Sequence, residues 1–544
     1  MKTALVPALP AALAAALGLW LGFPGLPCSL PLLVLLHPVG TALLGLGASS
    51  GRQAFARGWA AAAVGHSLAL YWLYVPMAEV GGLPLAGAVP CALLVCLVLA
   101  TQAGLFAAIC RRFWQPALWT SALAMGLVWY FLEYAYALAA GFPWLPLSGA
   151  LAPWPWTLQL ADTLGATLTS ALWAAAALAL CAGLLERRVL TALAGCALAL
   201  AIGLYGAAVL SLHPSEGGTG PDEAPFALPE ASADPDVFPV LLVEGNIDQN
   251  QKWVESYRTS TVEAYTGLSR EAVEAARAQC RNEEEREALA AYLSRGLIMW
   301  PETAMPFDLP TSAHTMALMT LARESGMALL TGAPGQEFDR EGRRLIYNRV
   351  WLMNAAGYPA GSYDKEHLVP FGEYVPAFFR WDFLAGLLQE VGAYTEGTRT
   401  APLRLGRLAM GPLVCYEAVF PWLAQERVEK GANVLVDVSN DGWFKDTAAP
   451  WQHLALTGLR ALEQNRWLVR CTNTGISAVY DSRGRLVFHG PQFRAEALWA
   501  SARIETEKSR FHLLFPYLPP VCALLMCGLI WTTSRKSRKN AATE

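Results

Sequence analysis

The feature that most constrains this chain is the uneven distribution of charge along its 544 residues. Residues 1–212 are almost uncharged and rich in Leu, Ala and Trp, whereas residues 213–511 have the composition of an ordinary globular protein. Residues 512–532 are apolar again, and the basic tail 533–544 follows them. Because long apolar runs are stable in lipid, the sequence predicts a membrane protein that carries one sizeable water-soluble domain. The net charge of −4 gives no reason to expect a nucleic acid partner.

Eight apolar stretches are long enough to be membrane spans, since a helix needs about 20 residues to cross the hydrocarbon core. They lie at about 4–23, 28–47, 56–77, 84–110, 117–138, 161–185, 188–212 and 512–532. The first stretch could instead be a cleaved signal peptide, because Lys2 precedes its apolar core. The sequence therefore predicts a membrane α-helical bundle of about eight spans, seven before the soluble region and one after it.

The basic residues of the apolar part lie in alternate loops. The loops near 24–27, 78–83 and 139–160 contain no Lys or Arg, whereas the other loops hold Lys2, Arg52, Arg57, Arg111, Arg112, Arg187 and Arg188. Under the positive-inside rule, this alternation places both chain termini in the cytoplasm. Seven crossings then place the soluble domain on the extracytoplasmic side of the membrane.

Two features of the apolar part allow more than one interpretation. Segments 141–146 and 153–156 are rich in Trp, Phe and Pro within a predicted outer loop. They fit either an aromatic belt at the membrane interface or a partly inserted loop that shapes lipid access. Glu133 lies inside a predicted span, where a carboxylate is costly unless it faces a partner or water. It could serve packing or a pathway, and the sequence favours neither.

The soluble region alternates between apolar strands and helices after a linker, 213–236, that is rich in Gly, Pro and acidic residues. We expect strands at 237–247, 297–302, 328–333, 345–355, 402–415 and 433–439, with hairpin-like strands over 467–488. We expect helices at 252–296, 312–326, 420–430 and 449–465. Continuous apolar strands between helices are typical of sheets that helices cover, so residues 237–511 are predicted to form an α/β domain.

Several of these strands end in reactive side chains. Glu302 ends one strand, Cys415 ends another, and Lys365 and Glu373 lie in a turn-rich loop. A carboxylate can take a thiol proton as general base, while an ammonium group can stabilise both a thiolate and a tetrahedral oxyanion. Glu, Lys and Cys together therefore suffice for acyl transfer. Two histidines keep a Cys–His pairing open as an alternative: His367 and His453.

Cysteine usage adds little. Most of the eleven cysteines lie in apolar segments, and only Cys280, Cys415 and Cys471 fall in the soluble region. Their spacing fits no zinc motif, so the sequence predicts no metal site. An odd count leaves at least one thiol free, and whether Cys280 and Cys471 pair stays open.

The ordered motifs Trp300-Pro-Glu302, Tyr363-Asp-Lys365 and Cys415-Tyr-Glu417 resemble the Glu-Lys-Cys triad motifs of the carbon–nitrogen hydrolase (nitrilase) superfamily. The whole chain, with its seven-plus-one span layout, resembles the apolipoprotein N-acyltransferase family. Further motifs support this resemblance: Gly245-Asn-Ile, Ser439-Asn-Asp-Gly-Trp-Phe, Pro450-Trp-Gln-His453, Arg460-Ala-Leu-Glu463 and Thr472-Asn-Thr-Gly-Ile.

The resemblance implies an αββα sandwich seated on a membrane bundle, and a role for each matching residue. Glu302 is expected to be the general base, Lys365 the stabiliser of thiolate and oxyanion, and Cys415 the nucleophile. The backbone N–H of Tyr416 is expected to complete the oxyanion hole with Lys365. The remaining matches are two supporting carboxylates and one aromatic residue associated with substrate access: Glu373, Glu417 and Trp253.

The resemblance also implies a two-step reaction without a cofactor. A phospholipid acyl chain passes to Cys415 as a thioester and then to the N-terminal amine of an S-diacylglyceryl-cysteine apolipoprotein. The expected location is the bacterial inner membrane, and the expected state is a monomer. One rival is a membrane-tethered nitrilase-type amidase, which would need at most one anchor. Another is a non-catalytic lipid-binding or transport protein, which would not need the intact triad.

Overall fold

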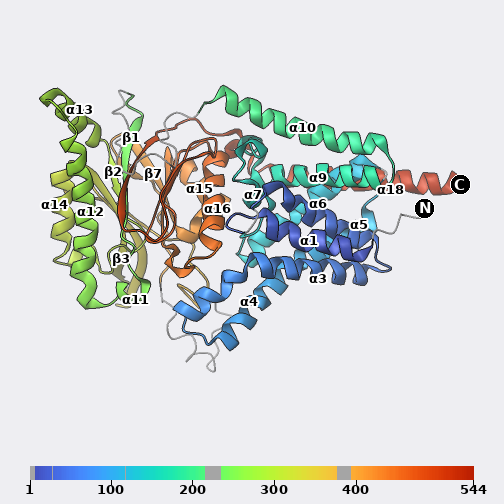
Figure 1. The fold of residues 1–544 in the computed structure, drawn as a ribbon, viewed down its shortest axis with the longest axis horizontal. Coiled ribbons are helices and arrows are strands. Elements are labelled where there is room, and N and C mark those ends of the chain that lie inside the picture. The colour runs from blue at the N-terminus through green and yellow to red at the C-terminus, as the bar shows by residue number, and fades with distance from the viewer. Residues whose placement is uncertain (1–6, 27–28, 117, 215–233, 376–393, 544) are drawn as a thin grey trace.

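The structure is a computed structural model that describes residues 7–26, 29–116, 118–214, 234–375 and 394–543. A helical bundle, formed by the N-terminal helices and the last helix, lies beside an α/β domain (Figure 1). Most of the predicted linker falls outside the described residues. The predicted domain boundaries stay predictions.

The α/β domain contains two six-stranded sheets, whose strand orders are β12-β1-β2-β3-β4-β5 and β11-β10-β9-β8-β7-β6. The first sheet comprises β1 (Val237–Glu244), β2 (Leu297–Met299), β3 (Ala328–Phe338), β4 (Arg344–Met353), β5 (Pro359–Asp364) and β12 (Glu496–Arg503). The second comprises β6 (Leu403–Leu405), β7 (Leu408–Val414), β8 (Val434–Ser439), β9 (Leu468–Thr472), β10 (Ala478–Tyr480) and β11 (Leu486–His489). The central strands β1, β2 and β3, like β7, β8 and β9, pair in parallel. Parallel strands need cover on both faces, which explains their continuous apolar sequences.

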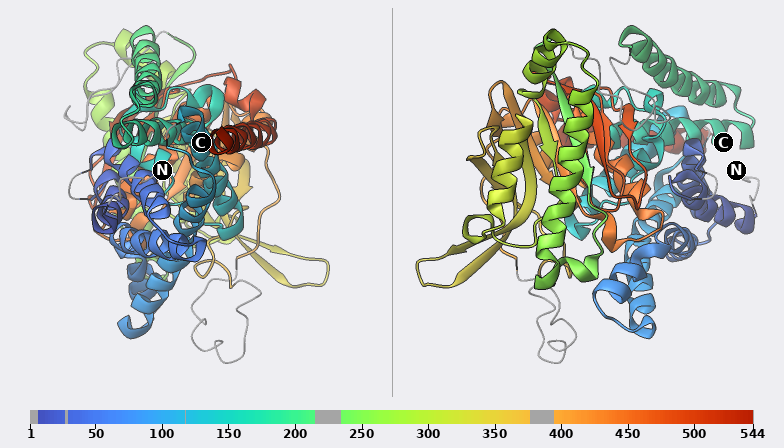
Figure 2. Two further views of the ribbon diagram at one scale, coloured as in Figure 1. Left: turned by 90° about the vertical axis from the view of Figure 1, so that its right-hand side faces the viewer. Right: turned by 60° about the vertical axis from the view of Figure 1, so that its left-hand side comes forward.

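Each sheet is covered by helices on its outer face, and the two sheets pack on each other. Leu242 and Met299 of the first sheet share a buried core with Val414 and Val436 of the second. The outer face of the first sheet packs on α12 (Arg258–Ala278), α13 (Glu283–Leu293) and α14 (Thr315–Ser325). The second sheet is covered by α15 (Pro421–Glu429) and α16 (Ala449–Gln464), as the turned views in Figure 2 also show. This arrangement is the predicted αββα sandwich.

Three details of the domain differ from the sequence prediction. The single helix predicted over 252–296 is divided into α11 (Gln249–Lys252), α12 and α13, and the Asn282 side chain caps the start of α13. The strand predicted over 402–415 is the hairpin β6–β7, which turns at Gly406 with φ +55. Strands β5 and β12 were not predicted, because Pro and Gly in β5 and small residues in β12 weaken the strand signal.

The bundle contains a helix that overlaps each of the eight apolar stretches. These are α1 (Ala8–Gly22), α2 (Leu36–Leu46), α3 (Gly51–Ala69), α4 (Leu85–Leu99) with α5 (Thr101–Phe113), α6 (Trp119–Ala140), α9 (Ala166–Leu185), α10 (Val189–Leu212) and α18 (Leu518–Thr543). Among the described residues, four stretches are long and apolar enough to cross a membrane: Leu85–Phe113, Trp119–Ala140, Ala166–Leu185 and Val189–Leu212. The predicted count of eight spans stays a prediction.

The bundle and the α/β domain share one continuous hydrophobic core. Trp72 and Trp144 of the bundle lie in the same buried cluster as Phe420 and Leu456 of the domain. A short helix, α7 (Leu147–Leu151), packs on α16, and a Cβ on its Gly149 would lie 2.9 Å from the Leu456 side chain. The helical layer of the second sheet is therefore enclosed between that sheet and the bundle.

The aromatic segment 141–146 lies at this junction. Trp144 is only 2% exposed, and its ring lies 5.4 Å from His453 and 5.8 Å from Phe444 of the domain. An interfacial belt is therefore the wrong interpretation for Trp144, since such residues face lipid headgroups. Glu133 of α6 contacts the segment that follows residues 141–146. Its Oε1 accepts hydrogen bonds from the Trp129 indole N–H and the Leu147 backbone N–H, each at 2.9 Å. These contacts give Glu133 a packing role that holds the start of α7.

Candidate active site

Cys415 lies where β7 ends and a 3₁₀-helix, Cys415–Val419, begins. Its φ is +53, in the left-handed region that non-glycine residues rarely adopt, and the residue is 8% exposed. The Cys415 N–H donates to Asp437 Oδ1 at 3.2 Å, and His453 Nε2 lies 3.1 Å from the Cys415 carbonyl oxygen. Cys415 therefore lies at the end of a strand, as predicted, and a helical turn follows it directly.

Three further candidate residues meet beside the first sheet. Lys365, directly after β5, places Nζ 3.4 Å from Glu302 Oε1 and 2.9 Å from Glu373 Oε2. All three side chains are buried, and Lys365 is only 1% exposed. Glu302 Oε2 is buried and has no hydrogen-bond partner within the described part of the chain, so it retains a free acceptor. The fold therefore brings together the Glu and the Lys that the sequence singled out.

The electrostatic interactions connect this pair to Cys415. Burial raises the pKa of the Cys415 thiol well above its usual value, Glu302 raises it further, and Lys365 opposes both. Burial acts to lower the pKa of Lys365, but Glu373, Glu302 and Cys415 together outweigh it and hold that pKa well above its usual value. A thiol that stays protonated at rest needs a base before it can attack. A buried carboxylate with a free oxygen suits that task.

The two residues after Cys415 have different surroundings. The Glu417 carboxylate accepts hydrogen bonds from the Tyr363 hydroxyl at 2.8 Å and from the backbone N–H groups of Glu366, His367 and Val414. Its acceptors are therefore directed to the protein, which suits the supporting role predicted for it. The Tyr416 hydroxyl donates to the Gly141 carbonyl oxygen of the bundle. The role predicted for the Tyr416 backbone N–H stays a prediction.

Trp253, the predicted substrate-access residue, is 45% exposed just after α11. Its neighbour Lys252 is 2% exposed, and the Lys252 Nζ donates to the Glu302 backbone carbonyl at 3.0 Å. Sequence reasoning missed Lys252, because a lysine in a charged stretch is usually solvated. A buried lysine against the Glu302 backbone makes α11 part of the site.

Lys252 carries a pH prediction. Burial lowers the pKa of Lys252 from 10.5 to about 8, although Glu302 and Cys415 oppose the shift. Between pH 8 and 10.5 the unfolded chain binds a proton here that the folded chain does not, so this group makes stability rise with pH. We expect the stability of Lys252→Met, relative to the unmodified chain, to be greatest at pH 7 and to fall by a few kcal/mol by pH 10. Thermal unfolding of both proteins across this pH range measures their difference in stability. A stability difference that does not change with pH would contradict the prediction.

Asn348 is a second residue that sequence reasoning missed. Its side-chain amide donates to Glu302 Oε1 at 2.6 Å and to Glu373 Oε1 at 2.8 Å, and its backbone carbonyl oxygen accepts from the Lys365 backbone N–H at 2.9 Å. The available signal was a polar amide in β4, a strand in which most residues are apolar. Asn348 bridges the two carboxylates that flank Lys365.

Replacing Asn348 by Leu should lower the rate of the chemical step by about tenfold to a hundredfold, because both carboxylates lose the donor that fixes them. Single-turnover kinetics of the purified protein would measure this. Asn433→Leu is the matched control. The Asn433 side chain also makes two hydrogen bonds, accepting from the Ala409 N–H and donating to the Arg407 carbonyl, but it lies beside the second sheet. Equal rates in the two variants would contradict the prediction.

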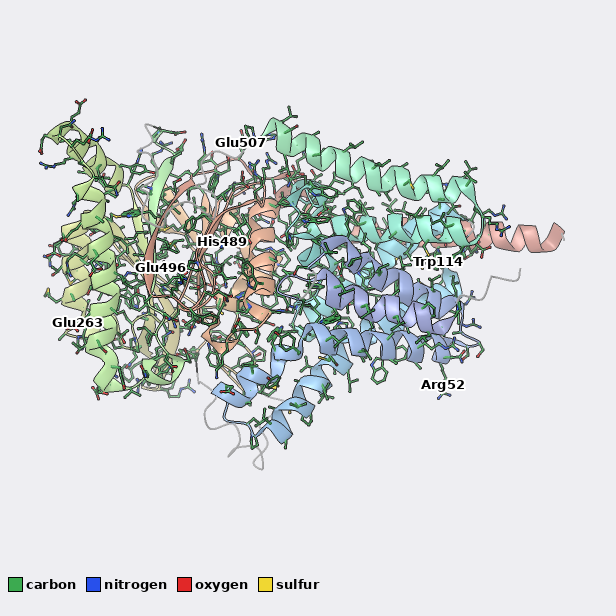
Figure 3. All side chains as sticks on the ribbon, in the orientation of Figure 1. Arg52, Trp114, Glu263, His489, Glu496 and Glu507 are labelled. Atoms are coloured by element: carbon green, nitrogen blue, oxygen red, sulfur yellow. The ribbon has the colours of Figure 1, made fainter. Side chains whose placement is uncertain are left out.

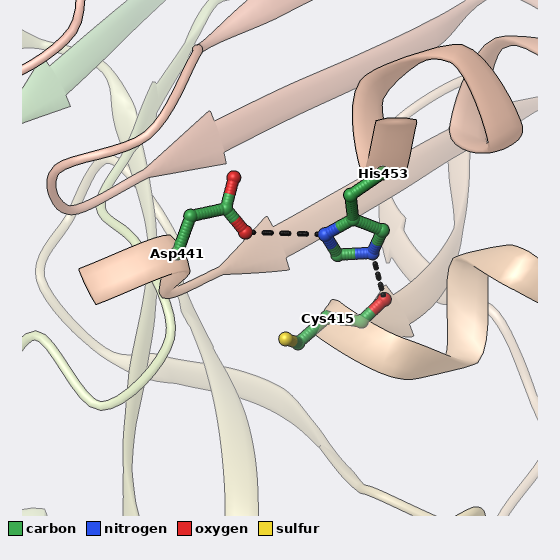
Figure 4. Close-up of side chains that lie close together, drawn as sticks. All are labelled: Cys415, Asp441 and His453. Carbon is green, nitrogen blue, oxygen red and sulfur yellow. Dashed lines mark hydrogen bonds and ion pairs between the residues drawn. The ribbon is translucent and has the colours of Figure 1, made fainter. Parts of the chain in front are cut away.

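Histidine is not placed to serve as the base for Cys415. His453 Nε2 faces a carbonyl oxygen, which only accepts, so Nε2 carries its proton (Figure 4). His453 Nδ1 lies 3.1 Å from both Asp441 Oδ1 and an Arg470 Nη2 donor. The second candidate, His367, packs its ring on Phe420 with centroids 4.1 Å apart. These contacts favour the Glu–Lys–Cys interpretation over a Cys–His pair.

Cys415, Asp441 and His453 are the one group of possible metal ligands found among the described residues, with ligand atoms within 4.8 Å of one another. The Arg470 guanidinium lies 2.8 Å from Asp441 Oδ2 and also meets His453 Nδ1. A cation at this position would compete with that fixed positive charge, so the group fits a metal ion poorly. Cys471 of β9 is a free thiol, as is Cys280 between α12 and α13, so these two do not pair.

This chain is similar in sequence to known proteins. The family model for carbon-nitrogen hydrolase matches residues 247–507. The family model for the apolipoprotein N-acyltransferase N-terminal domain matches residues 15–179. The chain is 33% identical over 483 residues to an apolipoprotein N-acyltransferase of Geobacter metallireducens, covering 86% of this chain and 85% of that one. It is 31% identical over 525 residues to that of Azotobacter vinelandii, covering 92% and 90%. A solved carbon-nitrogen hydrolase from Helicobacter pylori G27 aligns with a TM-score of 0.35 and 14% identity, over 49% of this chain and 89% of that one. The extent and identity of the sequence matches show that this chain belongs to the apolipoprotein N-acyltransferase family of enzymes.

Proposed function

We propose that this enzyme transfers an acyl chain from a phospholipid to the N-terminal amine of S-diacylglyceryl-cysteine on apolipoproteins, by way of a thioester on Cys415. In the first step the thiol gives its proton to Glu302 and the sulfur attacks the ester carbonyl carbon. Lys365 and the Tyr416 N–H stabilise the oxyanion. The ester C–O bond then breaks, and the proton on Glu302 passes to the leaving oxygen of the lysophospholipid.

In the second step the acceptor amine attacks the thioester carbonyl carbon. Glu302 takes a proton from the attacking nitrogen, a C–N bond forms and the C–S bond breaks. The departing thiolate recovers the proton from Glu302, so the enzyme returns to its starting state. A thioester reacts readily with an amine, and the amide product is the more stable compound, so this step needs no cofactor.

The observation that carries the proposal is that the turn holding Cys415 touches the bundle. The Tyr416 hydroxyl bonds to Gly141, and the Tyr416 ring stacks near Phe142 and Trp144, with centroids 6.4 Å from each. A nucleophile for small soluble amides would gain nothing from this position. A nucleophile for lipid substrates must lie at such a junction, which disfavours the amidase alternative. The buried Glu, Lys and Cys disfavour a non-catalytic protein.

We further propose eight membrane spans in the bacterial inner membrane, with a periplasmic α/β domain over 237–511 and cytoplasmic termini. Residues 213–236 serve as a linker, and 533–544 as the basic tail. Supporting this, Arg57 bonds to the Gly47 carbonyl and Arg111 to the Ser49 carbonyl, so two basic loops meet at one end of the bundle. Figure 3 places Arg52 and Trp114 at the end far from the domain. We expect the enzyme to act as a monomer.

The test of function uses the purified full-length protein in phospholipid vesicles. Mass spectrometry should find one acyl group on Cys415, and a synthetic S-diacylglyceryl-cysteine peptide should then remove it while gaining an amide-linked acyl chain. Hydrolysis of small amides without an adduct would favour the amidase instead.

Orientation has its own test. A membrane-impermeant protease added from the periplasmic side should cut the α/β domain in sealed membranes. Cleavage of that domain from the cytoplasmic side alone would contradict the proposed topology.

A further inference from the structure

The backbone of Cys415 is held by side chains from two different elements. Asp437 of β8 accepts the Cys415 N–H at 3.2 Å, and His453 of α16 donates Nε2–H to the Cys415 carbonyl at 3.1 Å. A φ of +53 is unfavourable for cysteine, so this conformation persists only where its surroundings enforce it. The two hydrogen bonds are the polar contacts placed to enforce it.

These two side chains are themselves fixed by Arg470. Its guanidinium pairs with Asp437 on one side and with Asp441 on the other, and it lies 3.1 Å from His453 Nδ1. All four side chains are at most 1% exposed. A buried charge that is paired on two sides resists rotation, because each lost contact would leave a charge without a partner. The His453 ring is thus locked with Nε2 toward the nucleophile.

The neighbouring residue on α16, Gln452, connects the same helix to the bundle. Gln452 Oε1 accepts the indole N–H groups of Trp72 at 3.0 Å and of Trp144 at 2.9 Å. Gln452 Nε2 donates to the Ala69 carbonyl, at the end of α3, at 3.1 Å. Gln452 is 1% exposed, so these bonds lie where water does not replace them. Trp144 also packs its ring on His453, 5.4 Å between centroids.

We propose that Gln452 and His453 are positioning residues that together form a joint, through which two bundle segments fix the backbone of the nucleophile. The inference rests on the proposed function of Cys415 as acyl carrier. Trp72 follows α3 and Trp144 follows α6, so the joint contacts two separate segments of the bundle. The adjacent residues Gln452 and His453, in one turn of α16, couple the positions of these segments to the Cys415 backbone. The enzyme then presents its thiol in the reactive conformation only while the α/β domain is seated on the bundle.

The first test separates the two nitrogens of His453. Glutamine can place an amide N–H where Nε2 lies, whereas asparagine can place one only where Nδ1 lies. We expect His453→Asn to slow acyl-adduct formation on Cys415 by about tenfold to a hundredfold, because small displacements of a reacting group have costs of this size. His453→Gln should restore at least half of that loss on a logarithmic scale. The rate of Cys415 alkylation by iodoacetamide, which needs no lipid, should change in the same order.

The second test separates the bundle contacts from general packing. Gln452→Leu removes all three hydrogen bonds, and Trp144→Phe removes one while keeping an aromatic ring. Gln464→Leu is the matched control: Gln464 is buried on the same helix, but its contacts are Gln425 and His512. We expect Gln452→Leu, and to a smaller extent Trp144→Phe, to slow both adduct formation and alkylation of Cys415, while Gln464→Leu changes neither by more than about twofold.

The outcomes distinguish this inference from the proposed function. Equal alkylation and acylation rates in His453→Asn, Gln452→Leu and the unmodified protein would overturn the joint and leave the acyl carrier intact. An unmodified protein that forms no acyl adduct, but whose Cys415 alkylation still follows the order above, would overturn the proposed function and support the joint. If Gln452→Leu does not fold, Trp144→Phe decides the question by itself.

Discussion

Replacing Cys415 by Ala should abolish the acyl adduct and lower transfer to an apolipoprotein peptide by at least about four orders of magnitude. The expectation follows from covalent catalysis, in which loss of the nucleophile removes the pathway rather than one contribution to it. Intact-protein mass spectrometry after incubation with phospholipid vesicles measures the adduct. A radiolabelled acyl chain measures the transfer with greater sensitivity.

Cys471→Ala is the control for this variant. Cys471 is also a buried free thiol. It lies in β9 of the second sheet, and its Sγ is 3.1 Å from the Met299 carbonyl oxygen. It should retain the adduct, since that thiol faces the core between the sheets. Acyl transfer by Cys415→Ala at more than a small fraction of the normal rate would contradict the assignment of Cys415.

The fold of the α/β domain was largely predictable because its central strands are buried on both faces. Strands such as β1 and β7 then contain continuous apolar runs, which no helix of ordinary amphipathic pattern resembles. The two strands that escaped prediction, β5 and β12, lie at the edges of the first sheet. An edge strand is stabilised by a partner on one side, so its own sequence can carry Pro, Gly or small residues.

The candidate site was predictable where a reactive side chain ends a strand, or belongs to a recognisable motif as Lys365 does. Glu302 and Cys415 are of this kind, and the sequence motifs identify them. Lys252 and Asn348 are not, because a lysine in a charged stretch and an amide in a strand are ordinary features of a sequence. Their importance depends on contacts with Glu302 across 50 and 46 residues of chain. Only the fold reveals such contacts.

The junction with the bundle was beyond sequence reasoning for a similar reason. Trp144 and Gln452 are separated by 308 residues, and a Trp in an outer loop fits an aromatic belt as well as a buried contact. The burial of Trp144 against α16 shows that the buried contact is the correct interpretation of the two. Sequence patterns predict which faces of a helix are apolar, but they do not say which distant element covers them.

Lys365→Met should slow thioester formation by about three orders of magnitude, the second largest effect that we expect. Methionine fills a similar volume but leaves the buried Glu302 and Glu373 carboxylates beside each other without the cation that both now contact. Two like charges in this position cannot both persist, so one carboxyl group should take up a proton near neutral pH. The variant thereby loses its oxyanion stabiliser and part of its base. Single-turnover acylation by the purified protein measures the loss.

The pH dependence of stability makes the Lys365 prediction specific. In the unmodified protein the Lys365 pKa is held well above its usual value, so the stability from this charge is constant below about pH 10. In the variant, a carboxyl group that binds its proton more tightly in the folded chain adds stability that is present at low pH and lost as pH rises. The unfolding temperature of Lys365→Met should therefore approach that of the unmodified protein at pH 5 and fall behind it at pH 8.

The control for Lys365→Met is Lys508→Met, because the Lys508 charge pairs with Glu429 at the surface, 3.0 Å away and accessible to water. An exposed pair contributes little to stability, so this variant should acylate normally and unfold close to the unmodified protein at both pH values. If Lys365→Met showed the same small effects, the buried charge would be a packing feature. The separation of the two lysine variants at pH 8, and its disappearance at pH 5, would instead show that the Lys365 charge offsets the two carboxyl groups it contacts.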